Sequence, residues 1–406
     1  MKTKFPGYFK LSEDEILNLW DNALFTLDAN ILLNLYRYSD ETKTEFIKIL
    51  RKLKERIWIP NQSAHEFFEN RLNVISQQEK SYEETISALN NMESEFKSSR
   101  QHPFLSKRLL KRFSTLTKEM CDELNENKDF HSKRIQGDDI LEEIESLFAN
   151  KVGDEFTEKE LEEIVKLGES RFAKKIPPGY KDNGKKDNSP NDIRKYGDLL
   201  VWKQIMNKSK ELKKAVILVT DDRKEDWWVR FKGKTLQPRP ELTKEFRTET
   251  EQAFHMYQSD RFLEFARDYL NEKVNQKTID EIRELRRLDE EKRHVLMQQE
   301  RAIIKQQKIK ERLLKERYMF EHDMDFLSKE IKMLEHKLHE KHCILEDGTL
   351  SEEEQKEIFM IERQLMELQS KRNHILHRMK DIEYDSLIER EVRKKTLPNN
   401  KYRSFG

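Results

Sequence analysis

Six acidic residues occupy positions at which carboxylates of an α/β protein can bind a metal ion. Asp28 directly follows the apolar run at 23–27, and two further acids follow the run at 215–219 after one threonine. Because ligands of open α/β sheets bind at the carboxyl ends of the strands, these acids are expected to share one crevice. The other candidates stand near predicted helix starts or one helical turn further along. The full set is Asp28, Glu66, Asp198, Asp221, Asp222 and Asp226.

Several carboxylates in one pocket cannot all remain ionised unless a cation offsets their charge. Mg²⁺ and Mn²⁺ suit a site made only of oxygen atoms. Either ion can activate water and hold phosphate oxygens, so the predicted chemistry is hydrolysis of a phosphodiester bond. The alternative is a structural role, because some of the 78 Asp and Glu residues follow strands by chance and Asp often caps a helix. Asp28 is the hardest to explain in this way, because it ends an otherwise apolar segment.

Short apolar runs alternate with helical segments in the first part of the chain. Buried strands are predicted at 23–27, 56–59 and 215–219. Helices are predicted to begin near Asn30 and Asn61, and this alternation is typical of a parallel sheet flanked by helices. A charged, mostly helical insertion is expected at about 81–172, between the second and third strands. The predicted fold class is therefore α/β, with one domain over 1–270.

The second part of the chain has the pattern of long helices. No Gly or Pro occurs from Glu241 to Asp347, a stretch of 107 residues. Two heptad series of apolar residues are mirrored about Gly348, and Ser351 followed by three glutamates is a helix start. The series are Leu313, Phe320, Met324, Leu327, Ile331, Leu334 and Leu338, then Ile358, Ile361, Leu365, Leu368, Ile375, Met379 and Ile382. We expect an antiparallel coiled-coil hairpin over 277–395, with its turn near 346–351, that serves self-association or a protein partner.

The composition excludes several classes of protein. The chain has 406 residues and only two cysteines, so neither a disulfide framework nor a Cys-rich zinc site is expected. No run of about 18 apolar residues exists, so no membrane span is expected. The first ten residues lack the apolar core of a signal peptide, which favours a cytoplasmic location.

The formal net charge of zero hides strongly basic segments. The segment 171–196 has eight Lys or Arg and three Asp, contains several Pro and Gly, and leads directly to Asp198. It is expected to hold the phosphates of a nucleic acid, with Tyr180 stacking on a base; the alternative is a solvated linker. The candidate substrate-binding residues are Lys174, Lys175, Tyr180, Lys181, Lys185, Lys186, Arg194 and Lys195. A second basic segment, 301–317, is interpreted as a phosphate-contacting ridge or as a solvated helix face.

Four segments resemble one known family. Residues 27–36, LDANILLNLY, are similar to the first motif of PIN domains. More narrowly, the chain resembles bacterial PIN-like domain proteins formerly catalogued as a domain of unknown function. That resemblance depends on PPGYKD at 177–182, YGDLLVWK at 196–203 and VTDDRKEDWW at 219–228. These segments occur in the family's order within about 16–265.

The resemblance implies a Rossmann-like sheet that carries a metal-dependent ribonuclease or flap-nuclease type of site. Its ligands and acids would be Asp28, Glu66, Asp198 and Asp222, with Asn30 and Thr220 orienting water or ligands. Asp221 replaces the Asn of the family's Thr-Asn-Asp pattern, which leaves open which of Asp221, Asp222 and Asp226 binds the metal. RNA is the first expected substrate and single-stranded or flap DNA the second. The alternative is a non-catalytic nucleic-acid-binding protein or a coiled-coil scaffold.

Overall fold

The computed structural model describes residues 1, 4–98, 105–182, 184, 193–344 and 351–396, and the chain forms two compact units, Met1–Asp289 and Glu290–Gly406. The strands are β1 (Leu24–Leu27), β2 (Ile57–Trp58), β3 (Val216–Val219), β4 (Trp228–Phe231), β5 (Lys234–Pro238) and β6 (Phe254–Tyr257). The helices of the first unit are α1 (Glu13–Asn22), α2 (Ala29–Asn34), α3 (Asp40–Lys52), α4 (Asn61–Lys97), α5 (Lys107–Ser132), α6 (Asp139–Phe148), α7 (Glu158–Ala173), α8 (Gly197–Leu212), α9 (Pro240–Thr250) and α10 (Ser259–Tyr269). Two long helices follow, α11 (Gln276–Ile344) and α12 (Glu352–Thr396).

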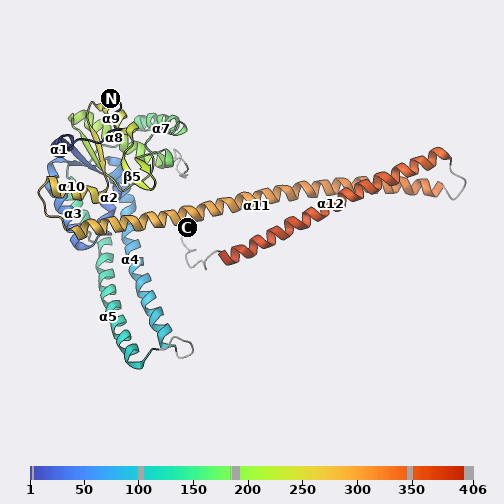
Figure 1. Ribbon diagram of the computed structural model, residues 1–406, viewed down its shortest axis with the longest axis horizontal. Helices are drawn as coiled ribbons and strands as arrows, with labels where there is room; N and C mark the ends of the chain where they lie inside the picture. Colours follow the sequence, from blue (N-terminus) through green and yellow to red (C-terminus); the bar gives the residue numbers. More distant parts are fainter. Residues whose placement is uncertain (2–3, 99–104, 183, 185–192, 345–350, 397–406) are drawn as a thin grey trace. The chain divides into compact units, whose positions relative to one another are not determined.

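A parallel four-stranded sheet in the order β2-β1-β3-β6 forms the centre of the first unit (Figure 1). Phe25 lies opposite both Ile57 and Ile217, and Ile217 lies opposite His255. This confirms the α/β class and the three predicted strands. The fourth strand, β6, and the separate antiparallel hairpin β4–β5 were not predicted from the sequence.

Side chains of the central strand β3 alternate between two cores, one on each face of the sheet. Ile217 and Val219 belong to the core that contains Trp20 and Phe262, whereas Leu218 belongs to the core that contains Trp202 and Phe246. Because both faces are covered by helices, β3 is apolar at every position, as expected for a buried parallel strand.

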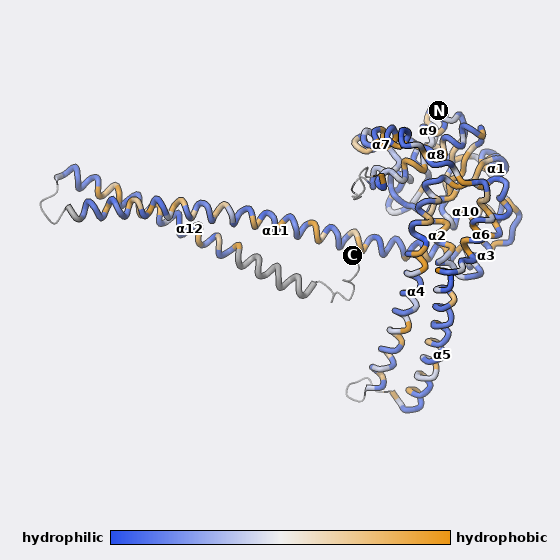
Figure 2. Tube along the Cα trace, turned by 180° about the vertical axis from the view of Figure 1, so that it is seen from behind, coloured by the Kyte–Doolittle hydropathy of each residue, from blue (hydrophilic) through white to orange (hydrophobic). Residues whose placement is uncertain are grey.

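Most of the expected insertion is helical. Helices α4 and α5 run side by side away from the sheet (Figure 1) and contact each other through an edge-on pair of rings, Phe96 and Phe113. Figure 2 shows that this pair of helices is mainly hydrophilic, with scattered apolar positions. The insertion continues with α6 and α7, and α6 buries Ile144 and Phe148 in the first core.

The second unit contains most of α11 and α12, which pack through predicted heptad positions. Ile331 on α11 and Ile361 and Leu365 on α12 form a buried apolar cluster. Ser351 donates its hydroxyl to Glu354 and accepts the Glu354 backbone N–H, as predicted for a helix start. The expected helical hairpin agrees with this packing, whereas its coiled-coil character and its oligomeric role stay predictions. Of the expected turn at 346–351, only Ser351 lies within the described residues.

The first turns of α11 belong to the first unit. Ile279 and Ile282 are buried in the core that contains Trp20, and this compact unit extends to Asp289. The division into domains at 1–270 and 277–395 stays a prediction.

His255 on β6 gives the fold a testable pH dependence. Burial lowers the pKa of its imidazole to about 4. Between pH 6.5 and 4 the unfolded chain therefore binds a proton that the folded chain does not, and folding stability falls as the pH falls through this window. From this residue the free energy of unfolding should drop by up to about 2 kcal/mol between pH 7 and pH 5. Urea unfolding of wild type and His255→Gln at both pH values checks this, and equal pH dependence in both proteins would contradict it.

Candidate active site

Asp28 is held at the carboxyl end of β1 by groups from two strand ends. It caps α2, and its Oδ1 accepts the Ala29 N–H at 2.7 Å. Its Oδ2 accepts the Thr220 hydroxyl and the Asn30 side-chain amide, each at 2.6 Å. Thr220 reaches Asp28 because β1 and β3 are neighbouring parallel strands, with Leu27 opposite Val219. The two strand ends therefore meet, as the sequence predicted.

The electrostatic surroundings of Asp28 connect it to two other acids. Burial, together with the charges of Glu66 and Asp222, raises the pKa of Asp28 to about 7, although hydrogen bonds from Thr220 and Ala29 oppose the shift. Because the negative charges of the three acids repel one another, a cation that enters the pocket would stabilise the ionised form of Asp28.

Glu66 projects from the second turn of α4 and lies beside the start of α8. Its Oε1 accepts the Gln62 side-chain amide at 2.8 Å. A Cβ added to Gly197 would lie 2.8 Å from the same oxygen, so a larger residue at the start of α8 would displace the Glu66 carboxylate. This close approach of α8 to Glu66 places Asp198, the next residue of α8, next to the pocket.

Three carboxylates surround the ammonium of Lys224. Its Nζ lies 2.8 Å from Asp182 Oδ2, 3.1 Å from Asp198 Oδ2 and 3.0 Å from Asp222 Oδ2. Burial raises the pKa of Asp198 to about 7; Lys224 opposes this shift, and Asp222, Asp182 and Asp28 add to it. Burial alone would lower the pKa of Lys224, but the three carboxylates raise it well above its usual range. Lys224 is therefore the internal counter-ion of this acidic group.

Sequence reasoning did not assign Asp182 or Lys224 to the site. Asp182 is the last residue of the PPGYKD segment, and Lys224 lies within the VTDDRKEDWW segment. A search restricted to acids that follow strands passes over both residues. Their place in the two segments that carry the family resemblance was the available signal.

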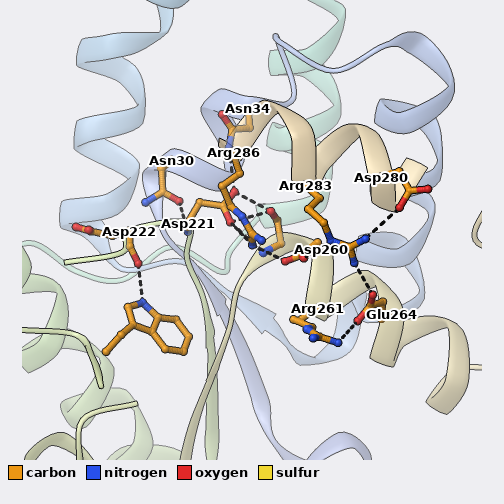
Figure 3. A network of polar contacts seen from close by, with 12 residues as sticks. Asn30, Asn34, Asp221, Asp222, Asp260, Arg261, Glu264, Asp280, Arg283 and Arg286 are labelled. Carbon is orange, nitrogen blue, oxygen red and sulfur yellow. Dashed lines mark hydrogen bonds and ion pairs between the residues drawn. The ribbon is translucent and has the colours of Figure 1, made fainter. Parts of the chain in front are cut away.

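Asp221 and Asp226 accept hydrogen bonds from other parts of the chain. Asp221 accepts hydrogen bonds from the Ser259 backbone and hydroxyl and from the Asn34 amide, and it lies next to Arg286 (Figure 3). Asp226 is fully buried, and its Oδ2 accepts the backbone N–H groups of Gly179 and Lys181 at 3.1 and 3.0 Å. Both acids therefore hold backbone segments, and Asp222 is the acid of the three that shares Lys224 with Asp198.

The candidate substrate-binding residues are dispersed. Lys174 and Lys175 are exposed at the end of α7, and Lys181 pairs with Glu225 at 2.6 Å. Tyr180 packs against the second core, and Lys195 lies over the Tyr196 ring at 5.0 Å. Arg194 is exposed within a short 3-10 helix, Ile193–Tyr196, just before α8. Lys185 and Lys186 lie outside the described residues.

The types of side chain in the pocket suit a divalent cation, but their present arrangement does not form a complete metal site. The side chains of Asp28, Glu66, Asp198 and Asp222 offer only oxygen atoms, which Mg²⁺ and Mn²⁺ prefer. Within the described part of the chain, however, no group of three or more His, Cys, Asp or Glu side chains is arranged to hold one metal ion. Lys224 already supplies a positive charge among three of the acids.

Comparison with known proteins identifies the class. A family model for a PIN-like domain matches residues 24–242, more than half of the chain, and the chain belongs to this family. The PIN superfamily is of the nuclease type, and its members usually use divalent metals. Searches of curated proteins and of solved structures found no match. Across the ranges that the structure describes, no helix is long and apolar enough to cross a membrane.

Proposed function

We propose that the chain is a Mg²⁺- or Mn²⁺-dependent nuclease that hydrolyses phosphodiester bonds, with RNA as its first substrate and single-stranded or flap DNA as its second. The observation that carries this proposal is the mutual effect of Asp28, Asp198 and Asp222, because burial and like charge raise the pKa values of Asp28 and Asp198 to about 7. A group of acids that destabilise one another's charge at the carboxyl edge of a parallel sheet is what a bound divalent cation stabilises.

In this proposal Asp28, Glu66, Asp198 and Asp222 hold the metal. The metal, when bound, stabilises charge on phosphate oxygens and lowers the pKa of water. Asn30 and Thr220 fix the orientation of Asp28, because both donate hydrogen bonds to its Oδ2. Asp222 is preferred to Asp221 and Asp226 as a ligand because it shares the Lys224 ammonium with Asp198.

The substrate-binding part of the proposal concerns the segment 171–196. Cationic side chains before Asp198 would contact phosphates, which positions a nucleic acid without selecting its sequence. Lys174, Lys175 and Arg194 are exposed, as this role requires. Lys181, Lys185, Lys186, Lys195 and the Tyr180 ring complete the proposed set.

Cleavage of end-labelled single-stranded RNA and DNA by the full chain, in Mn²⁺ or in EDTA, tests this function. We expect cleavage only with the metal, and faster cleavage of RNA than of DNA. Asp28→Asn should cleave at least about 100-fold more slowly, because loss of a metal ligand should lower the rate at least as much as loss of a group that orients such a ligand. Asp325→Asn, an exposed acid of α11, is the matched control and should cleave like wild type. No cleavage with any divalent ion, or equal rates for wild type and Asp28→Asn, would contradict the proposal.

A second candidate function is nucleic-acid binding without cleavage. Lys224 favours it, because its ammonium already neutralises part of the acidic group. Binding of RNA without cleavage in the same experiment would support this alternative. With either function we also propose a cytoplasmic location, and self-association or docking of a protein partner through the second unit.

A further inference from the structure

An arginine from α11 contacts the turn that follows β3. Arg286 is only 8% exposed, and its Nη1 donates a hydrogen bond to Asp260 and lies 3.6 Å from Asp221 Oδ1 (Figure 3). It lies beyond residues 24–242, to which the family model matches. The contact therefore adds a residue from outside the matched segment to the surroundings of the proposed site.

The Asp221 carboxylate is bound by several groups of the chain. Its Oδ1 accepts the Ser259 backbone N–H at 3.0 Å, and its Oδ2 accepts the Ser259 hydroxyl at 2.7 Å and the Asn34 amide at 3.1 Å. These donors are neutral, and the cation beside them is Arg286. Because a buried carboxylate is costly without a compensating charge, Arg286 is the group that makes an acid tolerable at this position.

Two short chains of hydrogen bonds connect the turn at 220–222 to Asp28. The Asp221 backbone N–H donates to Asn30 Oδ1 at 3.0 Å, and the Asn30 amide donates to Asp28 Oδ2. In the second chain the Asp222 backbone N–H donates to the Thr220 hydroxyl, which in turn donates to Asp28 Oδ2. A shift of the turn at 220–222 would therefore move the groups that orient Asp28 together with the Asp222 side chain.

A second ion pair holds the same helix near the same place. Arg37 donates to both oxygens of Asp289 at 2.7 and 2.6 Å, and it also donates to Asn34 Oδ1 at 3.0 Å. Asn34 is the residue whose amide reaches Asp221. The first turns of α11 therefore contact the turn after β3 directly through Arg286. They also contact it indirectly, from Asp289 through Arg37 and Asn34.

We infer that Arg286 is a positioning residue of the proposed nuclease site. It neutralises Asp221 and so holds the turn at 220–222, which carries Thr220 and Asp222 to the acids that would bind the metal. This inference rests on the proposed function. It makes the start of α11 a required part of the catalytic unit, so that the unit ends after Arg286 rather than at the last residue of the family match.

The test combines Arg286→Met with a compensating change in the full chain. We expect Arg286→Met to lower the cleavage rate about tenfold at unchanged RNA affinity, a cost of about 1.4 kcal/mol. Hydrogen exchange of the peptide that covers 219–223 should speed up about tenfold, because the Asp221 and Asp222 amides lose fixed partners. Asp221→Asn, added to Arg286→Met, removes the charge that Arg286 offset at Asp221, and Asp260 keeps its contact with Arg283 at 3.4 Å. The double variant should therefore return both quantities to within about threefold of wild type.

Arg283→Met is the matched control. Arg283 lies one helical turn earlier and contacts Asp260, Glu264 and Asp280 but not Asp221, so its loss should leave exchange at 219–223 unchanged. Equal effects of the two arginine variants, wild-type behaviour of Arg286→Met, or failure of Asp221→Asn to rescue it would overturn the inference. If Arg286→Met does not fold, folding of the double variant supports the inference and its failure to fold overturns it. If wild type does not cleave RNA, the proposed function fails while the exchange measurements still decide the role of Arg286.

Discussion

Replacement of Lys224 with methionine is expected to lower the free energy of unfolding in EDTA by about 3–5 kcal/mol, as for removal of one partner from a buried ion pair. The ammonium lies within 3.1 Å of the Asp182, Asp198 and Asp222 carboxylates. Without it these acids repel one another in a partly buried place and have no cation. The loss should shrink as the pH falls from 8 to 6, because the acids then take up protons more readily in the folded chain than in the unfolded chain.

Divalent metal should separate the Lys224 variant from wild type. If the Lys224 ammonium takes the position of a bound metal ion, addition of Mn²⁺ should restore most of the stability that Lys224→Met loses and should stabilise wild type less. Urea unfolding in EDTA and in Mn²⁺ measures both effects. Lys224→Arg keeps the charge and Lys210→Met removes an exposed pair with Glu249, so both should change stability by less than about 1 kcal/mol. Equal Mn²⁺ responses in Lys224→Met and wild type would contradict this interpretation.

Replacement of Trp202 with alanine should be about as costly, by about 3–5 kcal/mol. Its ring is fully buried against Phe246, Phe254 and Trp227, and its Nε1 donates to Glu245 at 3.1 Å. Trp202 lies one helical turn after Asp198 on α8. Packing of its ring therefore also determines the position of Asp198 relative to the sheet. The cavity left by alanine should therefore reduce both stability and metal binding.

Trp202→Phe provides the comparison for that prediction. Phenylalanine fills most of the space and loses the hydrogen bond to Glu245, so a smaller cost of about 1–2 kcal/mol is expected. Chemical unfolding of the three proteins measures the differences. Equal stabilities for Trp202→Ala and wild type would mean that α8 is not anchored by this ring.

The central sheet was predictable where burial leaves a simple pattern. The strand β3 is apolar throughout and β1 is apolar except for Thr26, because both strands are covered on both faces. Strand β6, with the sequence FHMY, is as short but contains a histidine and has no Gly or Pro beside it. No local signal distinguishes this segment from the helices on either side. Its pairing with β3, which precedes it by the β4–β5 hairpin and α9, makes it a strand.

The acid positions were predictable and the orientations of their side chains were not. Strand ends and family-like segments indicate Asp28, Glu66, Asp198 and Asp222 as candidates, and their role as ligands stays a prediction. Whether Asp221 or Asp222 faces the pocket depends on Ser259 and Arg286, which lie 38 and 65 residues further along the chain. A lysine two residues after an acid resembles an ordinary surface charge, so Lys224 gave no signal by itself.

Titration of Mn²⁺ into the full chain by isothermal calorimetry tests most directly whether the acidic pocket is a metal site. We expect saturable binding to wild type and an affinity at least about tenfold lower for Asp28→Asn, with Asp325→Asn unchanged. No saturable binding to wild type, or equal affinities for wild type and Asp28→Asn, would contradict a metal-dependent nuclease site at Asp28.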